Sequence, residues 1–382
     1  MVRSLTIVIH RAKHYIRTLL KYLVYLFAVA GFVLVAGFFA VKWHWTDVKG
    51  IIDLNDREFL NTAANSAASG AAAEASSSFA APELPFSCKL LSLAKYSPRD
   101  AGNIITAYRE TGSVDLADNM FTSLAMAVAT SSPLQGELTA CDAAGEAPIL
   151  NVSPSSTSEY AWVNTPDWQV LSAAVIKDAP VIARVSSETG VEPRLIVAQI
   201  VGEQMRIYNS ERALFESAFA PLKILGSETQ FSLGVTGIKE QTAEQVEQNL
   251  TASSSVYYPG PTYEHLLDFS TSDPTTERVE RITDQHDHYY SYLYTALYLK
   301  EVMAQWSSAG FDISARPEIL STLYNLGFTS SHPNATPHTG GTAITINGQD
   351  YTFGSLGYEF YYSGELADVF PFSATSTKWG IL

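Results

Sequence analysis

The chain has 382 residues, enough for two domains that each bury a sizeable core. Six of its 24 basic residues and none of its 39 acidic residues precede Thr46, which leaves 18 basic against 39 acidic residues after that point, a net charge of −21. This charge argues against nucleic acid as a partner, because nucleic-acid binding needs a basic surface. A soluble exported domain would carry the same charge.

The first 45 residues predict a membrane anchor. Residues 1–21 are basic, and the twenty residues 22–41 contain no charged side chain. That length crosses a bilayer as a helix, whereas the apolar part of a cleaved signal peptide, the competing interpretation, is shorter. Because the basic flank stays in the cytoplasm, we expect a single-pass inner-membrane protein. Residues 1–21 would be cytoplasmic, and the remainder periplasmic or extracellular.

Residues 46–86 predict a juxtamembrane segment and an Ala/Ser-rich linker too poor in large apolar residues to form a core. Residues 87–145 predict a small helical domain, because apolar residues recur there at helical spacing. Cys88 and Cys141 bracket this domain. Two cysteines in an oxidising compartment favour a disulfide, with two buried free thiols as the alternative. They supply too few ligands for a zinc site, and we expect no metal.

Residues 160–382 predict a larger, mainly helical domain. A helix that begins near Pro193 is largely apolar until it reaches Gly202, Glu203 and Gln204. Burial penalises the charged form of a carboxyl group, so Glu203 at the end of such a helix suits a general acid at neutral pH. A solvated helix end is the simpler alternative.

Three patterns follow this helix. The turn S-L-G-V-T-G-I, from Ser232 to Ile238, is rich in small residues, so backbone can approach a ligand closely there. Apolar and tyrosine residues at spacings of three and four predict one long helix over residues 276–306. A further helix carries Y-N-x-G at Tyr324 and Asn325, and alternating runs around Asn-Gly predict a β-hairpin over residues 343–353.

A helix that ends in Glu, then S-x-G-x-x-x-I, then Y-N-x-G is an order that resembles the lysozyme-like lytic transglycosylases. Their pattern is a catalytic Glu, a G-x-M-Q-I-like turn and an A-Y-N-x-G helix. The resemblance covers roughly residues 168–328. The chain departs from it at Gln204, where the family usually has Ser, and at Gly237, where it usually has Gln. The resemblance implies a lysozyme-like helical domain with Glu203 as the catalytic residue.

The resemblance also implies the reaction and its substrate, which is peptidoglycan cut at the MurNAc–GlcNAc bond. Glu203 would protonate the glycosidic oxygen and then, as a carboxylate, take the proton from the C6 hydroxyl of the sugar. This intramolecular attack gives a 1,6-anhydro product and needs no cofactor. We expect the substrate to be held by a set of residues that comprises Ser232, Gly234, Ile238, Tyr324, Asn325, Gln204 and Glu228.

Two other functions remain open. Glycoside hydrolysis usually needs a second carboxylate, and Glu228 is the best candidate by position, so the same site could be a hydrolysing muramidase. Because Gln204 and Gly237 depart from the pattern, the domain could instead be an inactive peptidoglycan-binding scaffold in an envelope assembly. The expected partners are peptidoglycan strands and, through the N-terminal helix, the membrane. The sequence does not indicate a protein partner.

Overall fold

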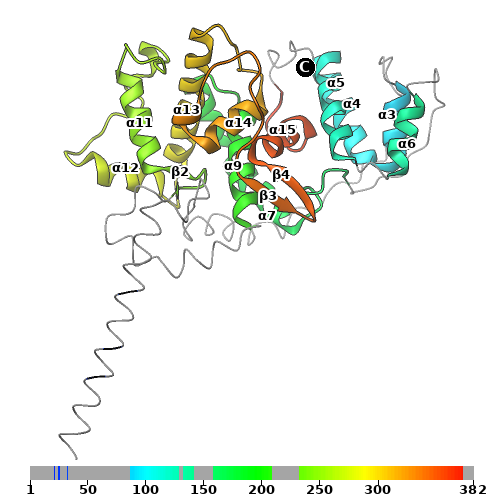
Figure 1. Cartoon of the computed structure of the whole chain (residues 1–382), viewed down its shortest axis with the longest axis horizontal. Coiled ribbons are helices and arrows are strands. Elements are labelled where there is room, and N and C mark those ends of the chain that lie inside the picture. The colour runs from blue at the N-terminus through cyan, green and yellow to red at the C-terminus, as the bar shows by residue number, and fades with distance from the viewer. Residues whose placement is uncertain are drawn as a thin grey trace, which may run out of the picture.

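A computed structural model describes residues 87–128, 132–141, 158–208 and 232–372, together with Lys21, Tyr25 and Phe32. This part of the chain is mainly helical, as the sequence predicts, with two short antiparallel sheets (Figure 1). The α-helices are α3 (Ser87–Tyr96), α4 (Pro98–Thr111), α5 (Val114–Ala127), α6 (Pro133–Cys141), α7 (Pro166–Lys177), α8 (Ala179–Thr189), α9 (Pro193–Tyr208), α11 (Glu240–Thr251), α12 (Pro274–Ile282), α13 (Tyr289–Ser308), α14 (Pro317–Leu326) and α15 (Phe353–Ser363). The short helices and strands are η4 (Pro261–Tyr263), η5 (Phe328–Ser330), β1 (Ser232–Leu233), β2 (Ile238–Lys239), β3 (Ala343–Ile346) and β4 (Gln349–Thr352).

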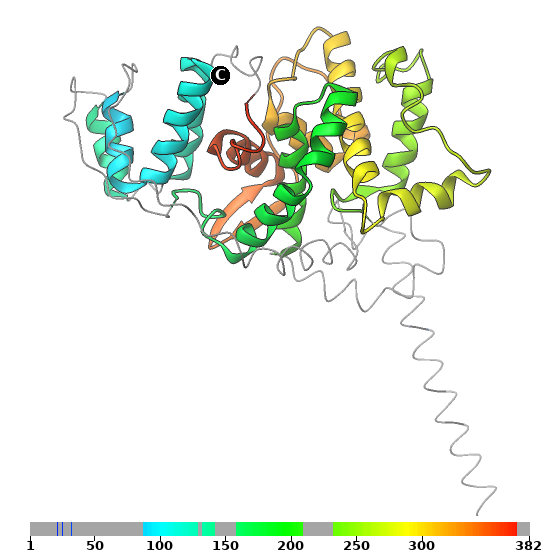
Figure 2. The ribbon, with the colours of Figure 1, turned by 180° about the vertical axis from the view of Figure 1, so that it is seen from behind.

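Helix α9 lies at the centre of the larger helical unit. Residues 194–206 in α9 are buried on every side of the helix, and α9 contacts α7, α8, α13, α14 and α15. Figure 2 shows α7 and α9 in green across the back of this unit. Where α9 meets the start of α15, a Cβ atom at Gly202 would lie 2.7 Å from the Phe353 ring. The glycine therefore lets the two helices pack closely just before Glu203.

The predicted β-hairpin is present as β3 and β4. Asn347 and Gly348 have φ angles of 51° and 80°, which suits a type I′ turn. Ile344 pairs with Tyr351, and both side chains are buried. The aromatic residues that follow belong to α15 and are largely packed in the core rather than presented to solvent.

The single long helix predicted over residues 276–306 is wrong, because the structure divides this region into α12 and α13. Asp284 Oδ1 accepts hydrogen bonds from the backbone N–H groups of His286 at 2.8 Å and Asp287 at 3.1 Å. Such a side-chain turn competes with helical hydrogen bonding. His288 then precedes α13, and its Nδ1 lies 2.5 Å from Asp178 Oδ2 in the core.

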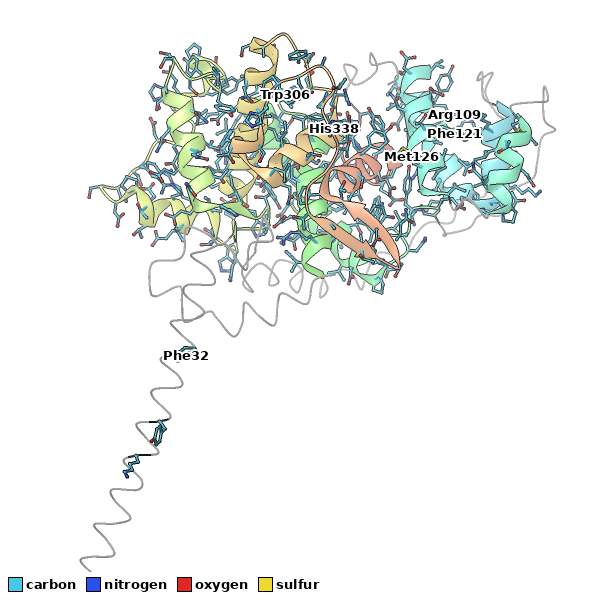
Figure 3. The ribbon with its side chains drawn as sticks, viewed as in Figure 1. Phe32, Arg109, Phe121, Met126, Trp306 and His338 are labelled. Carbon is cyan, nitrogen blue, oxygen red and sulfur yellow. A yellow bond between two sulfur atoms is a disulfide. The ribbon has the colours of Figure 1, made fainter. Side chains whose placement is uncertain are left out.

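Helices α3 to α6 form the smaller unit, at the right of Figure 1. The predicted disulfide between Cys88 and Cys141 is present and joins α3 to α6. Figure 3 labels Phe121 and Met126 on α5, of which Phe121 is buried and Met126 is exposed. Helix α5 packs against α15, and Arg99 of α4 makes a two-point ion pair with Glu365, at 2.8 and 2.5 Å. The two units therefore share one continuous core.

Several predictions fall on residues that the structure does not describe. These are the cytoplasmic segment and the membrane span over residues 22–41, apart from Lys21, Tyr25 and Phe32, together with the linker up to residue 86 and Glu228. No helix in the described part of the chain is long and apolar enough to cross a membrane.

Candidate active site

Glu203 lies on α9 and is 2 % exposed. The sequence pattern predicted that the helix ends at this residue, but the helix continues to Tyr208. It continues because Met205 and Arg206 also pack inward, at 0 % and 4 % exposure. Glu203 is therefore held by a full further turn of helix, which fixes the direction of its side chain.

The turn between β1 and β2 packs directly on this carboxyl group. Gly237 has a φ angle of 68°, a conformation that glycine adopts without strain. A Cβ atom at Gly237 would lie 2.3 Å from Oε1 of Glu203. A larger residue in this position would displace the carboxyl group. Glycine at this position thus matches the local geometry.

Three side chains hold the turn in place. Gln204 Nε2 donates to the carbonyl oxygen of Val235 at 2.7 Å, and the Tyr324 hydroxyl donates to that of Thr236 at 2.9 Å. The Thr236 hydroxyl in turn lies 3.1 Å from that of Ser291 on α13. Burial, with a smaller contribution from the Glu203 charge, raises the pKa of Tyr324. Tyr324 therefore remains a hydrogen-bond donor to the turn.

Arg206 forms a buried ion pair with Glu203 that the sequence analysis missed. Its Nε donates to Oε2 of Glu203 at 3.3 Å, and its Nη2 contacts Oε1. The two side chains are 4 % and 2 % exposed. The spacing of three residues could have revealed the pair, because residues i and i+3 share a helix face. The guanidinium therefore places a counter-charge directly at the carboxyl group.

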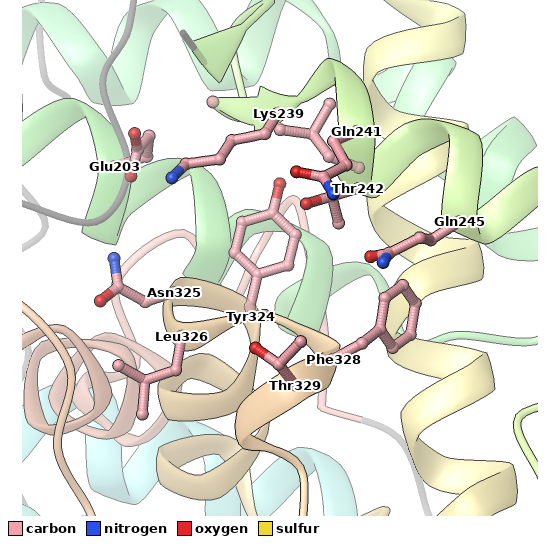
Figure 4. A pocket seen from close by; sticks show the side chains of 13 residues that line it. Glu203, Lys239, Gln241, Thr242, Gln245, Tyr324, Asn325, Leu326, Phe328 and Thr329 are labelled. Atoms are coloured by element: carbon pink, nitrogen blue, oxygen red, sulfur yellow. The ribbon is translucent and has the colours of Figure 1, made fainter. Parts of the chain in front are cut away.

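Glu203 lies at one end of a pocket of about 530 Å³ (Figure 4). The first turns of α11 supply one wall with neutral polar side chains, and the end of α14 with the start of η5 supplies the other. The lining residues are Glu203, Gly237, Ile238, Lys239, Gln241, Thr242, Gln245, Tyr324, Asn325, Leu326, Gly327, Phe328 and Thr329. Figure 4 shows Lys239 pointing toward Glu203. The pocket therefore combines one carboxyl group with amides, hydroxyls and aromatic rings.

Asn325 has two functions in this wall. Its Oδ1 accepts hydrogen bonds from the backbone N–H of Thr342 at 2.8 Å and from the Thr342 hydroxyl at 3.0 Å. These bonds fix the orientation of the amide, and Figure 4 shows its nitrogen turned toward the side of the pocket that holds Glu203. Asn325 thus holds the loop before the hairpin and presents a donor to the pocket.

The residues predicted for the site fall into three groups. Glu203, Ile238, Tyr324 and Asn325 line the pocket. Gln204 and Gly234 belong to the support behind it; a Cβ atom at Gly234 would lie 2.4 Å from the carbonyl oxygen of Ile282. Ser232 lies in β1 and pairs with Lys239 through the backbone. Glu228 is outside the described residues.

The pocket wall formed by α11 was not predicted from the sequence. Gln241, Thr242 and Gln245 lie within five positions of one another on this helix. Residues three and four apart share one face of a helix, so the spacing from Gln241 and Thr242 to Gln245 contained the signal.

Comparisons with protein-family models, curated proteins and solved structures found no match. Within the described ranges, no group of three or more His, Cys, Asp or Glu side chains is placed to hold a metal ion. The chemistry of the pocket is therefore inferred from its own geometry.

Proposed function

We propose that this protein is a lytic transglycosylase that cleaves the MurNAc–GlcNAc bond of peptidoglycan. The larger helical unit would be a divergent lysozyme-like domain. Residues 22–41 would anchor it in the inner membrane, with the pocket on the periplasmic or outer side. One observation carries the proposal: a buried carboxyl group, Glu203, lies at the end of a pocket whose other described lining residues include no carboxylate.

The chemistry requires one group that gives and then takes a proton. Protonated Glu203 would donate to the glycosidic oxygen as the bond from that oxygen to C1 breaks. The resulting carboxylate would take the proton of the C6 hydroxyl while the C6 oxygen bonds to C1. No water enters the product, and Glu203 regains its proton. Arg206 would stabilise the carboxylate between the two steps.

The remaining pocket residues support a sugar ligand. Gln241, Thr242 and Gln245 offer neutral donors and acceptors of the kind that hydroxyl and acetamido groups need. Tyr324 and Phe328 supply the apolar surface on which a sugar ring can rest. Tyr324 and Gln204 act as positioning residues through the turn that contacts Glu203.

The test is the release of 1,6-anhydro-muropeptides from purified sacculi by the full-length protein. Glu203→Gln should lower the rate by about 10²–10⁴-fold, because the amide has the shape of the acid but cannot transfer the proton. The matched control is Glu244→Gln on the exposed face of α11, outside the pocket lining, which should leave the rate unchanged. Full activity of Glu203→Gln would refute the proposal.

The buried ion pair of Glu203 with Arg206 favours a second candidate. Both oxygens of Glu203 are engaged by Arg206 rather than by a ligand, so the domain could bind peptidoglycan strands without cleaving them. Binding of the wild-type protein to sacculi with no released product over long incubation would support this scaffold. Products with ordinary reducing ends would instead indicate a muramidase.

A further inference from the structure

A chain of hydroxyl groups lies beneath the turn that packs on Glu203. Tyr324 donates to the carbonyl oxygen of Thr236 at 2.9 Å, and Figure 4 shows its hydroxyl directed away from α14. The Thr295 hydroxyl, on α13, lies 3.1 Å from the Tyr324 hydroxyl and 2.9 Å from the carbonyl oxygen of Ser291. The Thr236 hydroxyl lies 3.2 Å from the same carbonyl oxygen and 3.1 Å from Ser291 Oγ. Because Thr236, Ser291 and Thr295 are fully buried, these groups must satisfy one another or the backbone.

Each hydroxyl has one proton to donate, which limits the directions in which these bonds can run. Because Tyr324 uses its proton on the Thr236 carbonyl oxygen, a bond between Tyr324 and Thr295 needs the proton of Thr295. The Ser291 carbonyl oxygen then accepts from the Thr236 hydroxyl, and the Ser291 hydroxyl donates to that of Thr236. In this arrangement all four protons have an acceptor. If Thr295 donated to Ser291 instead, its lone pairs would draw the Tyr324 proton away from the turn.

We infer that Thr295 is a positioning residue for the carboxyl group of Glu203. Its hydroxyl directs the Tyr324 proton to the turn, and the turn packs on Glu203 at Gly237. Thr295 is fully buried and is not among the residues that line the pocket, so it acts through Tyr324 and the turn. Hydrogen bonds in such a chain strengthen one another, so losing the first one weakens the hold on the turn. The effect on catalysis depends on the proposed function, whereas the effect on the turn does not.

The first measurement is hydrogen–deuterium exchange of the full-length protein, which needs no substrate. Thr295→Val keeps the shape of the side chain and removes the hydroxyl, and no buried donor loses its acceptor. The amides of residues 232–239 should exchange about 10-fold faster in this variant, in line with the loss of one buried hydrogen bond. Thr295→Ser keeps the hydroxyl and should exchange as slowly as the wild type.

The second measurement is steady-state cleavage of sacculi by the same proteins. Thr295→Val should lower kcat by about 10-fold and change KM by less than about twofold, because the pocket lining stays in place while the carboxyl group is held less firmly. Thr295→Ser should restore kcat. The control Thr189→Val makes the same change at a fully buried threonine of α8, whose hydroxyl donates to the carbonyl oxygen of Val185 at 2.8 Å. It should leave both kcat and the exchange of the turn unchanged.

Exchange of the turn at the wild-type rate in Thr295→Val would overturn the inference, whether or not the protein cleaves peptidoglycan. A loss of kcat that Thr295→Ser does not restore, or a higher KM with unchanged kcat, would also overturn it. If the wild-type protein cleaves no peptidoglycan but the turn exchanges faster in Thr295→Val than in Thr295→Ser and Thr189→Val, the proposed function fails and the effect of Thr295 on the turn stands.

Discussion

Gly237 has a conformation and a neighbour that each favour glycine. Its φ angle is positive, and its α-carbon faces the carboxyl group of Glu203, where no Cβ atom fits. Gln204 and Tyr324 hold the carbonyl groups of the same turn. The position of the carboxyl group therefore depends on a backbone segment rather than on one side chain.

Gly237→Ala should lower cleavage by at least about 10-fold, because a misplacement of about 1 Å at a reacting group can reduce a rate by about 10²-fold. Gly112→Ala is the matched control, since Gly112 has a φ angle of 66° and open space around its α-carbon. Both variants should lose about 1 kcal/mol or more of folding stability through the positive φ angle. Steady-state rates on sacculi, read beside thermal unfolding, separate the two effects. An active Gly237→Ala variant would contradict the account of this contact.

At the scale of the element, the C-terminal end of α15 is held by one buried side chain. Arg194 of α9 is fully buried and donates to the carbonyl oxygens of Phe360, Tyr361, Glu365 and Phe370 at 2.8–3.2 Å. Phe360 and Tyr361 belong to the last turn of α15, whose carbonyl groups lack an intrahelical partner, and Glu365 and Phe370 lie in the segment that follows the helix. Burial lowers the pKa of Arg194 to about 10, so it stays charged at neutral pH.

Arg194→Met should destabilise the protein by about 3 kcal/mol or more, because several buried carbonyl groups would lose their donor. Arg194→Lys should recover little of this, since one ammonium group cannot replace the planar fork of donors. Chemical denaturation measures both changes. A loss below about 1 kcal/mol for Arg194→Met would show that water or backbone groups satisfy the carbonyls instead.

The elements also show how far sequence patterns reach. Apolar spacing and Asn-Gly predicted α9 and the hairpin because they act locally. The disulfide was predictable because the chain has two cysteines and therefore one possible pairing within the chain. The break between α12 and α13 was not predicted, because the apolar spacing continues through it. The Asp284 side chain accepts hydrogen bonds from backbone N–H groups there, which ends the helical hydrogen bonding. The role of Arg206 was not predicted because apolar spacing gives no information about a charged residue. Its partner, Glu203, lies one helical turn away. The pocket wall formed by α11 was not predicted because the sequence does not show which face of this helix is turned toward the pocket.

At the scale of the molecule, buried acids lie where the two helical units meet. Burial raises the pKa of Asp100 to about 7 and that of Glu359 to about 8. Asp100 of α4 accepts hydrogen bonds from the Ser158 hydroxyl and the Glu159 N–H. Glu359 of α15 accepts one from the indole of Trp162 at 3.0 Å. The junction therefore carries acids that prefer their neutral form.

A carboxyl group with a raised pKa binds its proton more tightly in the folded state. For Glu359, the stabilisation is complete below its unfolded pKa of about 4.5 and is lost as the pH rises through about 8. Glu359→Gln removes this dependence while it keeps an acceptor for Trp162. We expect the variant to match the wild type at pH 5 and to gain at least about 1 kcal/mol over it at pH 8.5. Thermal unfolding at the two values measures this, and a difference that does not change with pH would contradict it.

We propose that the sugar itself, and not water, completes the reaction begun by Glu203. Digestion of sacculi in ¹⁸O-labelled water, followed by mass spectrometry of the released fragments, tests it directly. We expect the wild-type protein to form anhydro ends without the heavy isotope, and Glu203→Gln to form none. Reducing ends that carry ¹⁸O would contradict it.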